Sequence, residues 1–186
     1  MSKKGRLIVI TGPSGVGKTT LIKKLLKNFK DKIFFSISYT SRPARNNEIN
    51  GIDYFFISKE EFKERIKENK FLEYALVHDN YYGTDKKLID DTILSGKDCL
   101  LDIDVQGGLN LMSKNIKAIF IFIAPPSIVT LKERLIKRYT DTYEEIDKRV
   151  INAEKELKAK DNYQYIIVND NFNRAYKELE TILFNN

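Results

Sequence analysis

The residues GPSGVGKT, at positions 12–19, have the types and the spacing of a loop that binds phosphate groups. They match the pattern GxxxxGK[ST], in which glycines let backbone N–H groups turn toward a phosphate and a following helix adds positive potential. In such a loop the lysine neutralises β and γ oxygens, and the hydroxyl of the last residue faces Mg²⁺. The pattern predicts an ATP or GTP site. The residues expected there are Gly12, Pro13, Ser14, Gly15, Val16, Gly17, Lys18, Thr19 and Thr20.

The segments on either side of this loop have the properties that the motif requires. RLIVIT (6–11) is short, apolar, rich in β-branched residues and ended by a glycine, which predicts a buried strand. In the following TTLIKKLLKNF, leucines and lysines fall on opposite faces of a helix. A glycine turn could match the pattern by chance, but the strand and the helix favour the phosphate-binding interpretation.

Further along the chain, strand patterns alternate with helical ones. DCLLDID, AIFIFIA and YIIVND are predicted strands, each followed by a helical pattern. This alternation predicts an α/β fold with a parallel sheet covered by helices on both faces. Residues 37–87 contain more strand than the rest and resemble an insertion. There we expect FFSISYT (34–40), DYFFI, FLEYALV and YYGT as strands, and KEEFKERIKEN as a helix.

Composition and length indicate one globular unit that is not a membrane protein. The chain has 186 residues, of which 42% are hydrophobic and 31% are charged. No apolar run approaches the ~20 residues that cross a bilayer, and the apolar run near the N-terminus is too short for a secretory signal. We therefore expect a cytoplasmic protein. Cys99, the single cysteine, lies in an apolar run and is expected to be buried and inert.

The net charge of +6 does not by itself indicate a nucleic-acid partner. Basic residues alternate with acidic ones, as in KEEFKERIKENK, which is typical of solvated helix faces, and no DNA or RNA motif accompanies them. We expect neither nucleic acid nor membrane as a partner. A modest positive balance suits small anionic substrates such as nucleotides.

Several segments in order resemble guanylate kinase over nearly the full chain: GPSGVGKT, SYTSRPARNNEINGIDY, FLEYA, NYYGT, DIDVQG, IFIAPPS and IVND. The resemblance implies a P-loop core at about 1–36, 88–128 and 160–186, a GMP-binding insertion at about 37–87 and a lid at about 129–159. It also implies transfer of the γ-phosphoryl group of ATP, bound with Mg²⁺, to GMP, which yields ADP and GDP in purine nucleotide metabolism.

The same resemblance implies a site for the phosphate of GMP. The residues it assigns there are Arg42, Arg45, Tyr54 and Tyr82. Planar guanidinium groups bind phosphate oxygens in pairs, and tyrosine hydroxyls donate to the same dianion. Each residue alone could equally be a surface arginine or a strand aromatic, but their occurrence together with the phosphate-binding loop favours the site.

Glu73, in FLEYA, corresponds to the family residue that reads guanine. Guanine offers two adjacent donors to a carboxylate, whereas adenine offers an acceptor beside one donor, so a carboxylate at this position selects guanine. Ser38, Thr84 and Asp104 are expected around the base and ribose. Without the resemblance, Glu73 would be interpreted as an exposed acid on an edge strand.

The remaining expected site residues surround the triphosphate. Asp102 and Asp104 end an apolar strand, and Asp102 is the candidate for holding Mg²⁺ with Thr19, although spacing does not decide which aspartate faces the metal. Asn169 matches the family position near the ATP base. The resemblance assigns catalytic charge stabilisation to Lys18, Arg42, Arg134, Arg138 and Arg149. Each assignment has a plainer alternative. The helix arginines could form exposed ion pairs, the two aspartates could be solvated acids at a strand end, and Asn169 could be a turn residue.

Three other functions are compatible with part of the sequence. A non-catalytic guanylate-kinase-like domain that binds peptides characteristically lacks an intact phosphate loop, whereas this chain has one. A kinase for another acceptor is disfavoured by Glu73 and the arginine–tyrosine set, and an ATPase that binds nucleic acid by the lack of a motif. A monomer is the default, use of dGMP is left open, and Tyr139 stands where the lid often has glycine.

Overall fold

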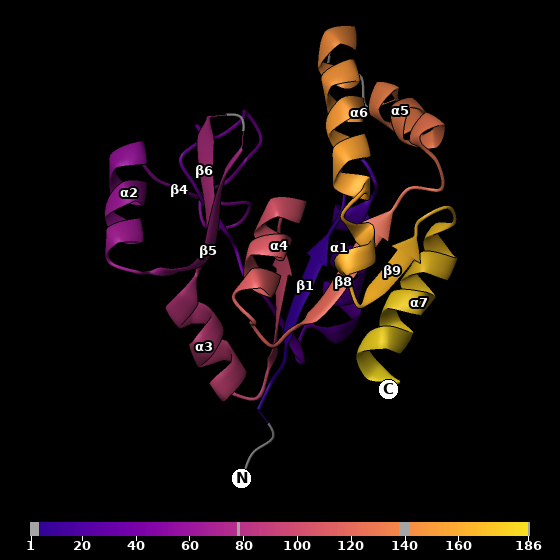
Figure 1. Ribbon diagram of the computed structural model, residues 1–186. Helices are drawn as coiled ribbons and strands as arrows, with labels where there is room; N and C mark the ends of the chain where they lie inside the picture. The colour runs from indigo at the N-terminus through magenta and orange to yellow at the C-terminus, as the bar shows by residue number, and fades with distance from the viewer. Residues whose placement is uncertain (1–3, 78, 138–141, 186) are drawn as a thin grey trace. The chain divides into compact units, whose positions relative to one another are not determined.

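The computed structural model describes residues 4–77, 79–137 and 142–185 of the chain (Figure 1). The strands are β1 (Leu7–Thr11), β2 (Ile33–Phe35), β3 (Tyr39–Thr40), β4 (Phe55–Phe56), β5 (Phe71–Val77), β6 (Asn80–Asp85), β7 (Asp98–Asp102), β8 (Ile119–Ala124) and β9 (Tyr165–Val168). The helices are α1 (Lys18–Phe29), α2 (Lys59–Lys67), α3 (Lys86–Leu94), α4 (Val105–Ser113), α5 (Ile128–Ile136), α6 (Tyr143–Leu157) and α7 (Phe172–Phe184), with a 3-10 turn at Lys160–Asn162.

The strands form two sheets of different kinds. The larger sheet has the order β2-β7-β1-β8-β9, with β2 parallel to β7 and β8 parallel to β9. Every residue of β1 is buried, as expected for a strand covered on both faces. The smaller sheet has the order β4-β3-β6-β5, in which β6 is antiparallel to both neighbours. The expected α/β fold, a parallel sheet flanked by helices, is confirmed.

The prediction of a single strand over residues 34–40 was wrong. The structure divides this stretch between the two sheets, because β2 pairs with β7 whereas β3 pairs with β4 and β6. The predicted strand DYFFI is also shortened to Phe55–Phe56. Alternation of polar and apolar residues reports which side chains are buried, and it does not report which backbone partner each residue finds.

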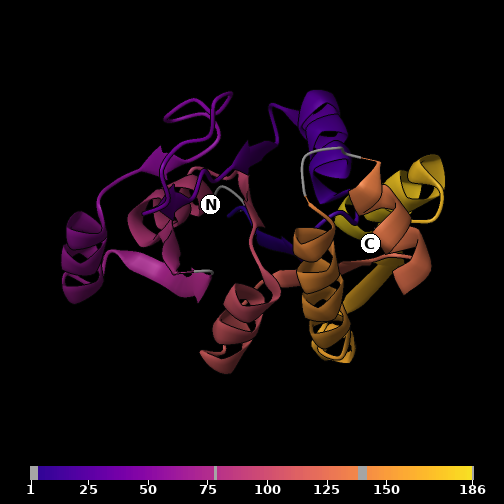
Figure 2. The same ribbon diagram turned by 90° about the horizontal axis from the view of Figure 1, so that it is seen from above.

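The chain divides into two compact units, which are described separately. The first contains Met1–Ile8, Asp31–Leu101 and Leu109–Ala118, and the second contains Val9–Lys30, Asp102–Gly108 and Ile119–Asn186. Within the second unit, α5 and α6 lie side by side (Figures 1 and 2). Within the first, Phe62 of α2 stacks on Phe71 and Tyr81 with ring centroids 4.4 and 5.2 Å away.

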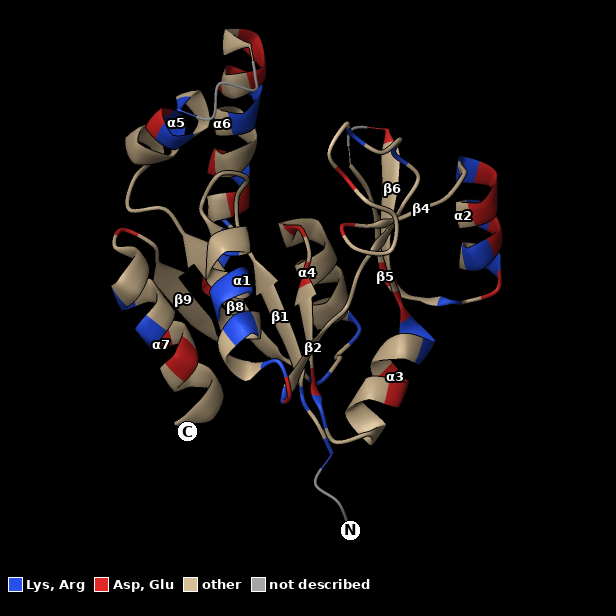
Figure 3. Ribbon diagram, turned by 180° about the vertical axis from the view of Figure 1, so that it is seen from behind, with Lys and Arg blue, Asp and Glu red and all other residues tan. Residues whose placement is uncertain are grey.

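Charged residues of both signs alternate on α2 and α6 (Figure 3), whereas the charged residues of α1 are all lysines. Among the described residues, no helix is both long and apolar enough to span a lipid bilayer. Cys99 of β7 is completely buried, as predicted, and burial raises the pKa of its thiol to about 12.

Candidate active site

The predicted phosphate-binding loop connects β1 to α1 in the second unit. Its last residue before the helix, Gly17, has a left-handed backbone with φ 99°, a conformation that glycine adopts without strain. Among the residues that the structure describes, no side chain caps α1, so N–H groups of its first turn are available to a ligand. The ammonium group of Lys18 donates to the carbonyl of Gly12 at 2.6 Å, which places its charge across the loop.

Two side chains from distant parts of the sequence hold the backbone of this loop. The buried amide of Asn169 donates from Nδ2 to the carbonyl of Val16 at 2.7 Å. Arg134 of α5 donates from Nη2 to the carbonyl of Asn169 at 2.8 Å and from Nη1 to that of Val16 at 3.4 Å. A Cβ atom on Gly17 would lie 2.5 Å from Nδ2 of Asn169, so glycine is required here for space as well as for φ. Asn169 and Arg134 thus shape the phosphate loop.

The two aspartates after β7 have different environments. The carboxylate of Asp104 accepts from the backbone N–H of Gly107 at 2.6 Å and thereby caps α4. The carboxylate of Asp102 makes no hydrogen bond to any residue that the structure describes. Burial raises the pKa of Asp102, and the positive charge of Lys18 opposes that shift. An acid with unused lone pairs close to the phosphate loop, together with the exposed Thr19 of α1, suits a divalent cation.

In the first unit, Glu73 and Thr84 face one another on neighbouring strands. They are direct partners in the β5–β6 ladder, and the Thr84 hydroxyl donates to Oε1 of Glu73 at 2.6 Å. Both are buried, with Glu73 only 3% exposed. The alternative interpretation of Glu73 as an exposed acid is therefore wrong, because its side chain is buried. The strand that carries it, β5, does lie at the edge of the sheet.

A β-bulge explains how Glu73 reaches this position. The β5–β6 register shifts between Phe71 and Glu73. Phe71 pairs with Asp85 and Glu73 pairs with Thr84, so β5 advances by two residues where β6 advances by one. Phe71 then packs on Phe62, while Glu73 faces the side of the sheet that carries Thr84. Because Tyr82 lies two residues before Thr84 on β6, its side chain emerges on that same side.

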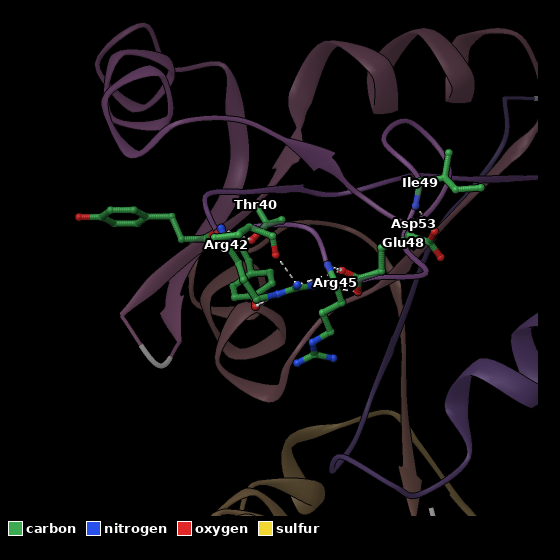
Figure 4. A network of polar contacts seen from close by, with 9 residues as sticks. Thr40, Arg42, Arg45, Glu48, Ile49 and Asp53 are labelled. Atoms are coloured by element: carbon green, nitrogen blue, oxygen red, sulfur yellow. Dashed lines mark hydrogen bonds and ion pairs between the residues drawn. The ribbon is translucent and has the colours of Figure 1, made fainter. Parts of the chain in front are cut away.

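Arg42 lies two residues after β3 within a network of polar contacts (Figure 4). Its Nε donates to the Tyr82 hydroxyl at 3.3 Å, and its Nη1 and Nη2 donate to the two oxygens of Glu48 at 2.9 Å each. The Tyr54 ring meets that of Tyr82 edge-on at 5.9 Å, and the guanidinium carbon of Arg42 lies 5.6 Å from the Tyr54 centroid. Glu48 holds the pKa of Arg42 above its ordinary value.

The sequence and the fold were compared with those of known proteins. The family model described as guanylate kinase matches residues 4–186. The guanylate kinase of Clostridium tetani is 48% identical over 181 residues, which cover 97% of this chain and 86% of the relative. That of Thermotoga maritima is 46% identical over 180 residues, with coverage of 97% and 86%. This chain belongs to the guanylate kinase family.

The solved structures agree with this membership. The crystal structure of guanylate kinase from Anaplasma phagocytophilum has a TM-score of 0.78 and 32% identity, and the match covers 97% of this chain and 85% of that one. The SH3-kinase fragment of tight junction protein 3 matches at a TM-score of 0.53 with 14% identity, over 97% of this chain and 56% of that one, which shows a shared fold alone. As a guanylate kinase family member, the chain is a nucleoside monophosphate kinase whose reaction converts ATP and GMP to ADP and GDP. The family generally requires a divalent metal with ATP.

The expected guanylate kinase residues are distributed between the two units. In the first unit, Arg42, Tyr54 and Tyr82 form one cluster and Glu73 and Thr84 a contacting pair, while Ser38 precedes β3. In the second unit, Lys18 and Asp102 interact electrostatically, Asn169 and Arg134 hold the loop, and Arg149 lies half-buried on α6. Arg138, Tyr139 and His78 lie outside the described residues.

Two acids in these units were not singled out from the sequence. Glu48 joins Arg42 to the turn at Arg45, and a partner six residues away in an irregular segment leaves no periodic signal. Glu156 of α6 is half-buried and has a pKa raised by burial and by Asp104, with the charge of Lys18 opposing. Its position on one face of a long amphipathic helix gave no reason to separate it from the solvated acids around it.

Proposed function

We propose that this chain performs the ATP:GMP phosphotransfer of its family with the residues assigned below. The observation that carries the assignment is the buried Glu73 carboxylate, paired with Thr84 on the same side of the sheet as the Tyr82–Arg42 cluster. A buried acid beside arginine and tyrosine donors is the arrangement needed to bind a guanine base at one end and its phosphate at the other.

For the donor nucleotide, we assign the phosphates of ATP to the backbone of Gly12–Thr20. Lys18 neutralises the β and γ oxygens, and the residues that would hold Mg²⁺ are Thr19 and Asp102. Bound Mg²⁺ would supply charge neutralisation on the triphosphate. Asn169 remains a candidate for a place near the ATP base, and its amide already supports the loop through Val16.

For the acceptor, Glu73 accepts from N1–H and the N2 amine of guanine, with Ser38 and Thr84 alongside. The phosphate of GMP is assigned to Arg42, Arg45, Tyr54 and Tyr82. Asp104 remains a candidate for the ribose, although its carboxylate also caps α4. Deoxyguanosine monophosphate, dGMP, would keep every contact except those to the 2′-hydroxyl, so its use depends on how much Asp104 contributes.

The reaction needs no protein base, because the acceptor phosphate is already an anionic nucleophile. The protein contributes positioning and positive charge instead. Lys18, Arg42, Arg134, Arg138 and Arg149 are the proposed sources of that charge. Closure of a lid at about 129–159 over a core at about 1–36, 88–128 and 160–186, with GMP in an insertion at about 37–87, would exclude water as a competing acceptor.

The test is ADP release from purified protein with ATP and Mg²⁺, with GMP, dGMP, AMP, CMP, UMP or no acceptor. Turnover that requires a guanine monophosphate is the expected result. Equal turnover with AMP would overturn the role of Glu73, and folded protein without turnover on any acceptor would favour a binding module. Replacing Mg²⁺ by Ca²⁺ tests the metal.

We further propose a cytoplasmic monomer that binds neither nucleic acid nor membranes. Charged residues of both signs along α2 and α6 support this proposal (Figure 3). Light scattering at micromolar concentration should give the mass of one chain, 21.7 kDa. ATP hydrolysis stimulated by DNA or RNA would contradict the proposal.

A further inference from the structure

The two arginines assigned to the acceptor phosphate are committed to different extents. Arg42 donates four of its five N–H groups to the protein. The Nε group donates to Tyr82, and both N–H groups of Nη1 and one of Nη2 are also used. The Nη1 partners are the carbonyl of Pro43 at 2.7 Å and one oxygen of Glu48 at 2.9 Å. One N–H of Arg42 is therefore left for a ligand.

Glu48 accepts from two of these four N–H groups, more than either of the other two partners. Its two oxygens take Nη1 and Nη2 of Arg42, and one of them also accepts from the backbone N–H of Arg45 at 2.8 Å. The backbone N–H of Glu48 donates in return to the carbonyl of Arg45 at 3.0 Å, which closes the turn 45–48. The Glu48 side chain is 18% exposed, and Arg42 holds its pKa below the ordinary value, so it is charged at neutral pH.

Arg45, by contrast, is exposed, and its guanidinium makes no hydrogen bond to the residues that the structure describes. Figure 4 shows this group pointing away from Glu48, while the Arg42 side chain reaches toward it. All five of its N–H groups can therefore serve a ligand, including a parallel pair on two phosphate oxygens.

We propose that Glu48 is a positioning residue for the acceptor phosphate, which fixes the Arg42 guanidinium and the turn that carries Arg45. Arg42 then contributes its charge and one N–H group to the phosphate, beside the Tyr82 hydroxyl. Arg45 contributes two parallel N–H groups that bind two phosphate oxygens. The proposal rests on the assignment of these arginines to GMP made above. It adds a residue that does not touch the substrate and acts through two residues that do.

The opposite role for Glu48 would be an internal anion that occupies the phosphate's place. The contacts favour positioning, because Glu48 is held by a backbone N–H as well as by Arg42 and closes a turn with its own backbone. A free arginine side chain loses much rotamer freedom when it binds a ligand, and an arginine already fixed in place avoids that loss. The two roles predict opposite changes in GMP affinity when the Glu48 charge is removed.

The experiment replaces Glu48 by glutamine, which keeps the size and one acceptor oxygen. We expect the Kd for GMP to rise about tenfold, as for the loss of one charge-assisted hydrogen bond. The Kd for guanosine, measured by competition, and the KM for ATP should not change, because Glu73 and the phosphate loop are untouched. Glu61→Gln is the matched control: it removes the carboxylate from another pair, with Arg65 at 2.9 Å, within α2 of the same unit.

Three results would overturn the proposal: an unchanged Kd for GMP, tighter binding of GMP, or an equal loss for GMP and guanosine. The last would mean that Glu48 supports the whole unit rather than the phosphate contacts. If Glu48→Gln does not fold, Glu48→Asp is the second variant, which keeps the charge but is shorter by one methylene. For this variant too, the Kd for GMP should rise while the Kd for guanosine stays unchanged. Wild-type protein that fails to phosphorylate GMP would refute the proposed function, whereas an active wild type with a normal Glu48→Gln variant refutes only this inference.

Discussion

Replacing Glu73 by glutamine isolates the contact on which guanine selection depends. Glu73 is 3% exposed and accepts from the Thr84 hydroxyl at 2.6 Å. Glutamine has the same size and keeps one oxygen that can accept from that hydroxyl. Its amide nitrogen is a donor, however, and would face a donor of guanine. The variant thus changes the hydrogen-bonding pattern of the site while leaving its volume intact.

The magnitude follows from two effects on binding. A hydrogen bond to a charged group contributes about 1.5–3 kcal/mol, and a buried donor left without an acceptor costs about 1–3 kcal/mol. The lower values together correspond to a loss of roughly 60-fold in affinity for GMP. The unfolding temperature should not fall, because a buried charge is removed and the Thr84 bond can persist.

Steady-state kinetics with GMP and AMP, combined with thermal unfolding, would measure these effects. The expected outcome is a KM for GMP raised by about two orders of magnitude, an unchanged KM for ATP and a smaller preference for GMP over AMP. A KM for GMP within about threefold of wild type in a folded variant would refute the reasoning, because the lost contact and the new donor would both have to be without cost.

Three further predictions test other parts of the structure. Asn169→Ala removes the 2.7 Å bond to Val16 and should raise the KM for ATP several-fold without changing that for GMP; equal effects on both would contradict a local role in the phosphate loop. The Cys99 thiol, with a pKa of about 12, should resist thiol reagents at pH 8 until the protein unfolds. Because the unfolded thiol ionises near pH 8.5, the free energy of unfolding should decrease as the pH rises from there toward 12. A midpoint of urea unfolding that does not change over that range would count against burial of the thiol. Thr142→Ala breaks the capping box at the start of α6 and should cost about 1 kcal/mol in urea unfolding, whereas Thr181→Ala, near the end of α7, serves as a surface control.

Local patterns predicted the parts of the site that lie together in the sequence. The phosphate loop needs a strand, glycines, a lysine and a helix within about two dozen residues, and each of these has a periodic or compositional signal. The alternation of strands and helices predicted the parallel sheet for the same reason. The burial of Cys99 likewise followed from its apolar surroundings.

Features that depend on long-range partners could not be predicted in this way. The division of residues 34–40 between two sheets, and the bulge that turns Glu73 toward Thr84, are decided by which strands pair. The bond between Asn169 and Val16 joins residues 153 positions apart. Guanylate kinase resemblance named Glu73 and Asn169 as site residues, but it did not show what holds them in place.

The arginines of the two units illustrate how the same side chain can be held with different electrostatic results. Arg134 is held by two backbone carbonyls, which are neutral, so its full positive charge stays close to the phosphate loop. Arg42 is held by the Glu48 carboxylate, which offsets part of its charge, whereas the guanidinium of Arg45 makes no hydrogen bond to the described residues. Donors that are fixed before the reactants arrive need no reorganisation when charge develops during transfer. The carbonyl-bound Arg134 is therefore suited to stabilising the transferring phosphoryl group, whereas the carboxylate-bound Arg42 is suited to defining where the acceptor phosphate sits.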